Sequence, residues 1–320
     1  MGSGGLRWQR TTVAVGFVVV GLAFAAMEPA DLFHEPGGHL LKTALVERIG
    51  LSFGFMAIGW ASASYLGALG RRTAGAGPFV RNLRIFAVAA VALAIGQLGE
   101  TTTDLQVWTM DGIPLRPFVG ALTTQVVVAV GFAFAAIGFW AAGTSLRRSR
   151  RSAPGPEPVD IRFPGTVSLR WPRAMVASGW TLVGLSFGAV TGYPDVRLMW
   201  SLGLTVGSIG IGWASSSYLG ALARLSGGTG PFVRSLQVFA AATIALAVDQ
   251  LADVYSNVRY WRAYRGGDLH HELLLVLLLA ALVVGFTVAA TGYGSAASLL
   301  RRTPSPSPVP PEPAPVGALR

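Results

Sequence analysis

The chain has 320 residues, of which 52% are hydrophobic and only 12% are charged. Soluble domains carry about 25% charged residues, so this composition, with a mean hydropathy of +0.53, excludes an ordinary soluble protein and a mainly disordered chain. The net charge of +10 does not indicate nucleic-acid binding, because the arginines form short clusters between apolar runs, which is typical of membrane topology. The absence of cysteine excludes disulfides, thiolate metal sites and iron–sulfur clusters.

Eight apolar stretches are long enough to cross a bilayer as helices, which takes about 20 residues. They predict an all-α polytopic membrane protein with eight transmembrane helices. In chain order the expected spans are Thr11–Met27, Ile49–Leu69, Phe79–Leu98, Phe118–Ala142, Ala174–Thr191, Leu198–Leu222, Phe232–Leu251 and Leu273–Leu299.

The distribution of charge predicts the orientation of these spans. The N-terminus, the second, fourth and sixth loops and the C-terminal tail hold 18 of the 25 basic residues. Of the 15 acidic residues, only Glu157, Asp160 and Glu312 lie on that side. By the positive-inside rule, both termini are expected in the cytoplasm, in a multi-pass protein of the cell's cytoplasmic (inner) membrane.

The second half of the chain repeats the first. Residues Gly59–Leu98 align with Gly212–Leu251 at a constant offset of 153, and 26 of these 40 positions are identical. Each copy holds four expected spans, so both should insert the same way round, as parallel repeats related by a pseudo-two-fold axis along the membrane normal. The predicted organisation is a first four-helix repeat (1–150), a Pro/Arg-rich cytoplasmic linker (151–169), a second four-helix repeat (170–302) and a disordered Pro-rich tail (303–320).

The repeated second helix contains small residues at every fourth position, among them Gly59 and Gly212. This spacing favours close packing against a neighbouring helix. The same motif brings serine and tryptophan into the membrane, and these residues are either packing elements or candidates for lining a substrate path: Ser62, Ser215, Trp60 and Trp213.

The two copies differ where the third helix of each ends. Gln97 is matched by Gln250 and Glu100 by Asp253, whereas Asp249 has Gly96 as its counterpart. Acidic groups in or near a bilayer are costly and usually face a cavity. We therefore treat these five polar residues as candidates for a cation or proton path, with Asp249 foremost; simple solvation at the outer end of the span is the alternative.

All four histidines fall on the predicted outer side, with a carboxylate beside the last pair. Imidazole and carboxylate groups can hold zinc or another divalent ion, but the spacing matches no standard motif, so an ordinary polar loop is the alternative. The candidate metal ligands are His34, His39, His270, His271 and Glu272. No histidine lies inside an expected span, which argues against haem, and no other cofactor is indicated.

These patterns favour a carrier or channel for a small solute or ion, with a path between the two halves. The competing hypothesis is a non-transporting membrane subunit, assembly factor or sensor with a metal or ligand site on the outer face. An enzyme is less expected, because no recognisable catalytic set is present. The expected partners are the lipid bilayer, the transported solute or ion, and either another membrane protein or a second copy of the chain.

Overall fold

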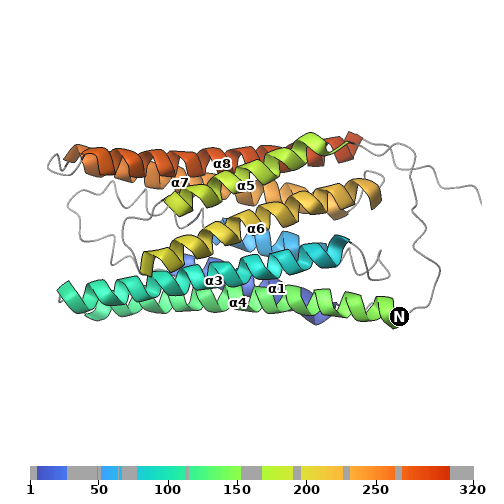
Figure 1. Ribbon diagram of the computed structural model, residues 1–320, viewed down its shortest axis with the longest axis horizontal. Coiled ribbons are helices and arrows are strands. Elements are labelled where there is room, and N and C mark those ends of the chain that lie inside the picture. Colours follow the sequence, from blue (N-terminus) through green and yellow to red (C-terminus); the bar gives the residue numbers. More distant parts are fainter. Residues whose placement is uncertain are drawn as a thin grey trace, which may run out of the picture.

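The computed structural model describes residues 6–26, 49, 52–63, 65–66, 78–111, 115–152, 168–189, 196–225, 231–263 and 269–302. Within these ranges the only regular secondary structure is α-helix, and the helices are eight in number. Residues 52–63 and 65–66 form what we call the second helical segment. The other helices are α1 (Arg7–Ala26), α3 (Pro78–Asp111), α4 (Leu115–Ser152), α5 (Arg170–Ala189), α6 (Val196–Leu225), α7 (Pro231–Ala263) and α8 (Leu269–Arg302) (Figure 1).

The helix starts follow local chemistry. Pro78 and Pro231 occupy the first positions of α3 and α7, where proline loses no intrahelical hydrogen bond and its fixed φ favours the helix. At the starts of α1 and α5, the Arg10 amide donates to the Leu6 carbonyl and the Arg173 amide donates to the Leu169 carbonyl. The first turn is therefore closed in the same way in both helices.

Among the residues that the structure describes, four helices are long and apolar enough to cross a membrane. Their apolar stretches are Val80–Thr102 in α3, Leu122–Arg148 in α4, Val233–Ala252 in α7 and Val276–Arg302 in α8. These helices contain 34, 38, 33 and 34 residues, and at about 1.5 Å per residue each is roughly 50 Å long or more. Each is therefore longer than the hydrocarbon core of a bilayer, which is about 30 Å thick.

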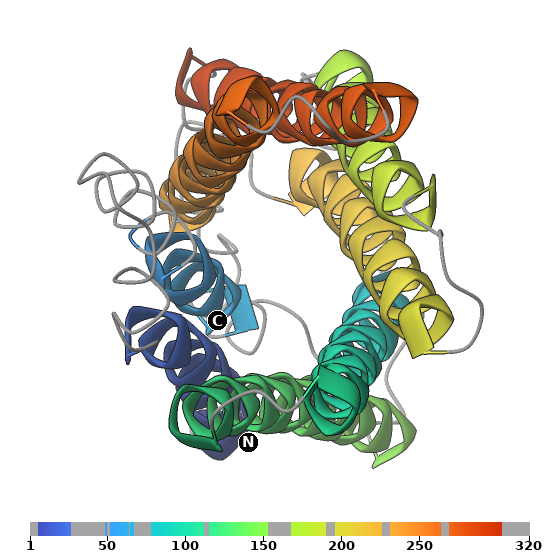
Figure 2. The same cartoon turned by 90° about the vertical axis from the view of Figure 1, so that its left-hand side faces the viewer.

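The helices are arranged as a closed ring when the bundle is viewed along its length (Figure 2). α3 packs between α4 and α6, and α8 packs between α5 and α7. α1 packs against α4, and α5 packs against α6. The second helical segment closes the ring, because Gly59 and Gly54 in it lie against Phe17 of α1 and Leu246 of α7. The order around the ring is α1, α4, α3, α6, α5, α8, α7 and the second helical segment. If each helix of the first half is exchanged for its counterpart in the second half (α1 for α5, the second helical segment for α6, α3 for α7 and α4 for α8), the order around the ring is unchanged.

Equivalent contacts recur in the two halves of the chain, which we define as the helices before and after residue 153. A methyl group on Gly16 would lie 2.5 Å from the Gly131 carbonyl oxygen of α4, and one on Gly179 would lie 2.5 Å from the Gly285 carbonyl oxygen of α8. Such a distance leaves no room for a side chain. The backbones of α1 and α4, and of α5 and α8, are therefore in direct contact, which accounts for glycine at these positions.

Two arginine side chains repeat the same interaction. Arg10 Nε of α1 donates a hydrogen bond to the Ala63 carbonyl oxygen at 3.1 Å, and Arg173 Nε of α5 donates to the Ser216 carbonyl oxygen at 3.0 Å. Ala63 and Ser216 are related by the sequence offset of 153. Each bond ties the start of one helix to the second half of the next.

The aromatic core also follows the sequence offset. Phe86 stacks on Phe139 with ring centroids 5.1 Å apart, and the matching Phe239 stacks on Tyr293 at 5.3 Å. These pairs place the beginning of α3 beside the end of α4, and the beginning of α7 beside the end of α8.

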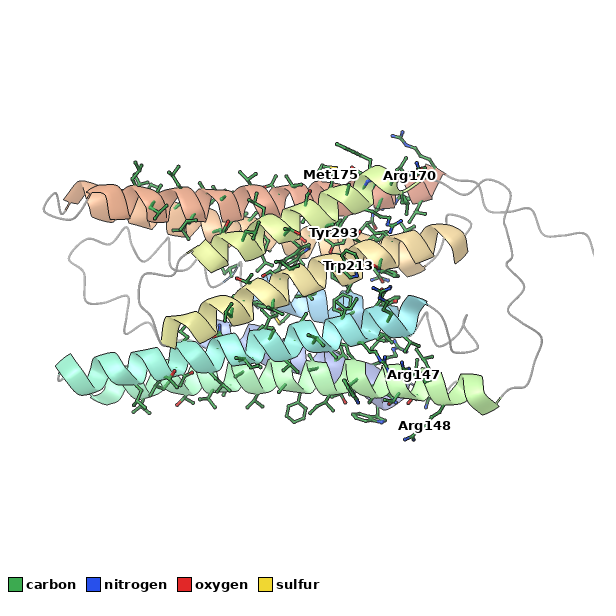
Figure 3. All side chains as sticks on the ribbon, in the orientation of Figure 1. Arg147, Arg148, Arg170, Met175, Trp213 and Tyr293 are labelled. Atoms are coloured by element: carbon green, nitrogen blue, oxygen red, sulfur yellow. The ribbon has the colours of Figure 1, made fainter. Side chains whose placement is uncertain are left out.

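The arginines gather at one end of the bundle. Figure 3 shows Arg147 and Arg148 of α4 and Arg170 of α5 at the same end. The aromatic pairs bring the starts of α3 and α7, with exposed Arg81 and Arg234, to this end as well. We call it the arginine-rich end.

The outer surface of the bundle is apolar. On α3, Val88, Val91, Ile95 and Leu98 are 42–54% exposed, whereas Leu93, on the other face of the helix, is 6% exposed. A continuous apolar face of this kind is unfavourable in water. It fits contact with lipid and supports a membrane-embedded protein.

Candidate functional site

Asp249 is the most deeply buried of the described acidic and amide side chains singled out in the sequence. It is 1% exposed in α7, and its Oδ2 atom accepts a hydrogen bond of 2.8 Å from the side-chain amide of Gln250. The residue lies three positions before the end of the apolar stretch Val233–Ala252. It is therefore an acidic group inside the apolar part of the bundle, nearer the end opposite the arginines.

The matching residues of the first half lie on α3. Gln97 is 8% exposed and Glu100 is half-buried. α3 packs against α4 and α6, and α7 packs against α8 and the second helical segment, so the two sets occupy opposite sides of the ring (Figure 2). The structure brings Asp249 and Gln250 together but leaves them apart from Gln97 and Glu100. Asp253 belongs to α7, but its side chain lies outside the described residues.

The serines and tryptophans of the repeated motif separate into two environments. Ser62 and Ser215 are 1% and 2% exposed, whereas Trp60 and Trp213 are 61% and 55% exposed. In the second helical segment, Trp60 is five residues before the buried Tyr65. Successive residues of a helix are rotated by about 100°, so the two side chains point about 140° apart around the helix axis. The tryptophans therefore face outward, and only the serines point into the bundle.

The predicted metal site lies almost wholly outside the described residues. His34 and His39 are among the residues that the structure does not describe, and His270, His271 and Glu272 lie in the first turn of α8 with undescribed side chains. Among the described side chains there is no group of three or more His, Cys, Asp or Glu residues that could hold a metal. The metal site stays a prediction.

The structure reveals a contact that was not singled out in the sequence. Tyr65 of the second helical segment and Tyr218 of α6 lie with ring centroids 4.1 Å apart, and both side chains are 3% exposed. The two helices are not neighbours in the ring, so the tyrosines meet in its interior. They occupy the same position of the repeated motif. The occurrence of tyrosine at this position in both copies was the only indication in the sequence, and it did not reveal that the two side chains touch.

The aromatic core differs between the halves at one matched pair of residues. In the second half, Trp180 Nε1 donates a hydrogen bond of 3.2 Å to Tyr293 Oη. The residues matching Trp180 and Tyr293 are Phe17 and Phe139. The interior of the bundle is thus more polar on one side than on the other.

This hydrogen bond gives a prediction about stability. Tyr293→Phe leaves the buried Trp180 N–H without its acceptor and is expected to lower the free energy of unfolding by about 1–3 kcal/mol. The Trp180→Phe/Tyr293→Phe double variant, which copies the first half, should cost less than the sum of the single variants. Unfolding in detergent of the four proteins of this double-mutant cycle measures the coupling, and additive effects would contradict the prediction.

No family of known proteins, no curated protein and no solved structure matches this chain, so its own geometry carries the functional argument.

Proposed function

We propose that the chain is an integral membrane carrier or channel for a small solute or ion. In this proposal it consists of two tandem four-helix repeats, with eight spans and both termini in the cytoplasm. Four long apolar helices, an apolar outer surface and the gathering of arginines at one end support this arrangement. The equivalent glycine and arginine contacts of the two halves support the duplication.

The observation that carries the proposed path is the contact between Tyr65 and Tyr218. Matched residues of two repeats can touch each other only close to the axis that relates the repeats. We therefore place a pseudo-two-fold axis through this pair and the path along that axis. The tyrosines would close the path toward the arginine-rich end, because Arg10 and Arg173 bond to carbonyls two residues before them.

The opposite end of the path would open near the polar residues of α3 and α7. Gln97, Glu100, Asp249 and Gln250 lie toward this end on two sides of the ring. Parallel repeats that rock against each other can expose a central site to either side of the membrane in turn. A carrier would use this motion, and a channel would need only the tyrosines to separate.

Reconstitution of the purified chain into vesicles tests the proposal. Vesicles containing trapped dyes for protons, potassium, sodium or chloride would report ion flux, and light scattering would report the entry of urea or glycerol. We expect at least one of these probes to cross faster than in protein-free vesicles of the same lipid. No flux of any probe, with the protein correctly inserted, would favour the non-transporting subunit, assembly factor or sensor.

A further inference from the structure

Two pairs of helices concentrate positive charge at the arginine-rich end. In the first half α1 begins and α4 ends there, and in the second half α5 begins and α8 ends there. Each pair contributes four arginines, two near the start of one helix and two near the end of the other. We call these groups the arginine tetrads, and they consist of Arg7, Arg10, Arg147 and Arg148 in the first half and Arg170, Arg173, Arg301 and Arg302 in the second.

Contacts between the paired helices hold each tetrad together. In the first half, the side-chain amide of Gln9 donates a hydrogen bond of 3.1 Å to Ser145 Oγ, two residues before Arg147. In the second half, a methyl group on Gly292 of α8 would lie 2.8 Å from the Pro172 carbonyl oxygen of α5. The start of one helix therefore lies against the last part of its neighbour, and arginines from both helices lie along one edge of the bundle.

No acidic residue of these four helices offsets the charge of the tetrads. α1, α4 and α5 contain no aspartate or glutamate, and Glu272, which α8 does contain, lies in its first turn at the opposite end. Seven of the eight arginines are exposed, and Arg173 is half-buried. α1 and α5 also point the positive ends of their dipoles this way, where a basic residue is unfavourable and an anion is stabilised. A bound anion would therefore relieve repulsion in each tetrad.

One arginine of each tetrad is held in place and keeps donors for such an anion. Arg10 Nε donates to the Ala63 carbonyl oxygen at 3.1 Å, and Arg173 Nε donates to the Ser216 carbonyl oxygen at 3.0 Å. Each bond uses one of the five N–H donors of a guanidinium group. The donors on the Nη atoms can still bind two oxygens of a phosphate in parallel.

Exposed side chains beside the tetrads indicate that the anion belongs to a lipid. Trp8 and Trp171 follow the first arginine of each tetrad and are 55% and 72% exposed. Tryptophan is enriched at the level of lipid headgroups. Val15 and Leu22 of α1 follow Trp8 at intervals of seven residues, and Leu185 of α5 lies fourteen residues after Trp171, so they share a face with the tryptophans. These three side chains are 48%, 54% and 57% exposed, and an apolar face of this kind fits an acyl chain.

We propose that each arginine tetrad binds the headgroup phosphate of an anionic phospholipid, with an acyl chain along the apolar face that begins at Trp8 or Trp171. The chain would hold two such lipids at equivalent places, one in each half. This inference goes beyond the proposed function and does not depend on the transport path, because bound lipid can be measured whether or not a solute crosses.

Native mass spectrometry of the full chain tests the proposal by counting retained lipids. The protein would be released from detergent micelles after incubation with phosphatidylglycerol or phosphatidylcholine at the same concentration. We expect the wild-type chain to retain two phosphatidylglycerol molecules and to lose phosphatidylcholine. Arg147→Gln/Arg148→Gln and Arg301→Gln/Arg302→Gln should each retain one, and the combined variant none. An arginine near anionic lipid strengthens binding about fivefold, so loss of a pair should weaken its site roughly 25-fold.

The matched control is Arg81→Gln/Arg84→Gln, which removes two exposed arginines of α3 at the same end and should retain two lipids. Arg147→Lys/Arg148→Lys keeps the charge and should also retain two. Equal retention of the two lipids by the wild type, or equal loss in the control and in the tetrad variants, would overturn the proposal. Displacement of phosphatidylglycerol by millimolar inorganic phosphate would show an anion site without specificity for lipid, and would overturn it as well.

Discussion

The Gly16→Ala/Gly179→Ala double variant is expected to be much less stable than the wild-type chain. Each new methyl group would lie 2.5 Å from a carbonyl oxygen of the facing helix, a contact that backbone atoms cannot relieve by a rotamer change. Overpacking of this kind costs about 1–3 kcal/mol per site. The two sites lie in different helix pairs, so their effects should add. Thermal and denaturant unfolding in detergent would measure the loss.

Gly294→Ala is the matched control for this experiment. Gly294 also lies in a long helix, α8, but a methyl group there would have no neighbour within 4 Å. Alanine inside a helix is favoured over glycine by about 0.5–1 kcal/mol, so this variant should be slightly more stable than the wild type. Equal effects at Gly294 and at Gly16 or Gly179 would show that helix propensity, and not contact between helices, determines the result.

The Tyr65→Ala/Tyr218→Ala double variant is expected to leak. The centroids of the two rings are 4.1 Å apart. If the rings close the path, their removal takes away this contact between the halves, and the probe that crosses the wild-type chain fastest should cross faster still. A tenfold rise corresponds to a barrier lowered by about 1.4 kcal/mol. The vesicle assay described above measures the change directly.

The control is Tyr65→Phe/Tyr218→Phe, which keeps both rings and should keep the flux close to that of the wild type. Because truncation of buried aromatic residues to alanine also costs about 3–5 kcal/mol of stability each, Tyr65→Leu/Tyr218→Leu serves as a milder second variant. Folded protein of either truncated variant with wild-type flux would contradict a closing role for the pair.

The sequence predicted the helices better than their ends. The expected span Phe118–Ala142 lies inside α4, which extends from Leu115 to Ser152. Hydropathy detects only the part of a helix that suits lipid, whereas hydrogen bonding continues through Arg147–Arg148 and beyond. Close packing at Gly59 and Gly212 was expected from their spacing and is confirmed by their contacts with Phe17 and Trp180.

The order of helices in the ring could not be predicted. A duplicated chain presents the same faces twice, so α3 could pair with the second helical segment of its own half or with α6 of the other half. The contact between Tyr65 and Tyr218 follows from that choice. Only the acidic character of Asp249 and its lack of an acidic counterpart were visible in the sequence.

The closure of the ring constrains how the protein is made. Gly54 of the second helical segment and Leu246 of α7 are in contact but are separated by 192 positions (246 minus 54). At about 5–20 residues per second, translation leaves the glycine face of the second helical segment without its partner for roughly 10–40 s. During biogenesis this face must therefore be covered by lipid or by the insertion machinery until α7 arrives.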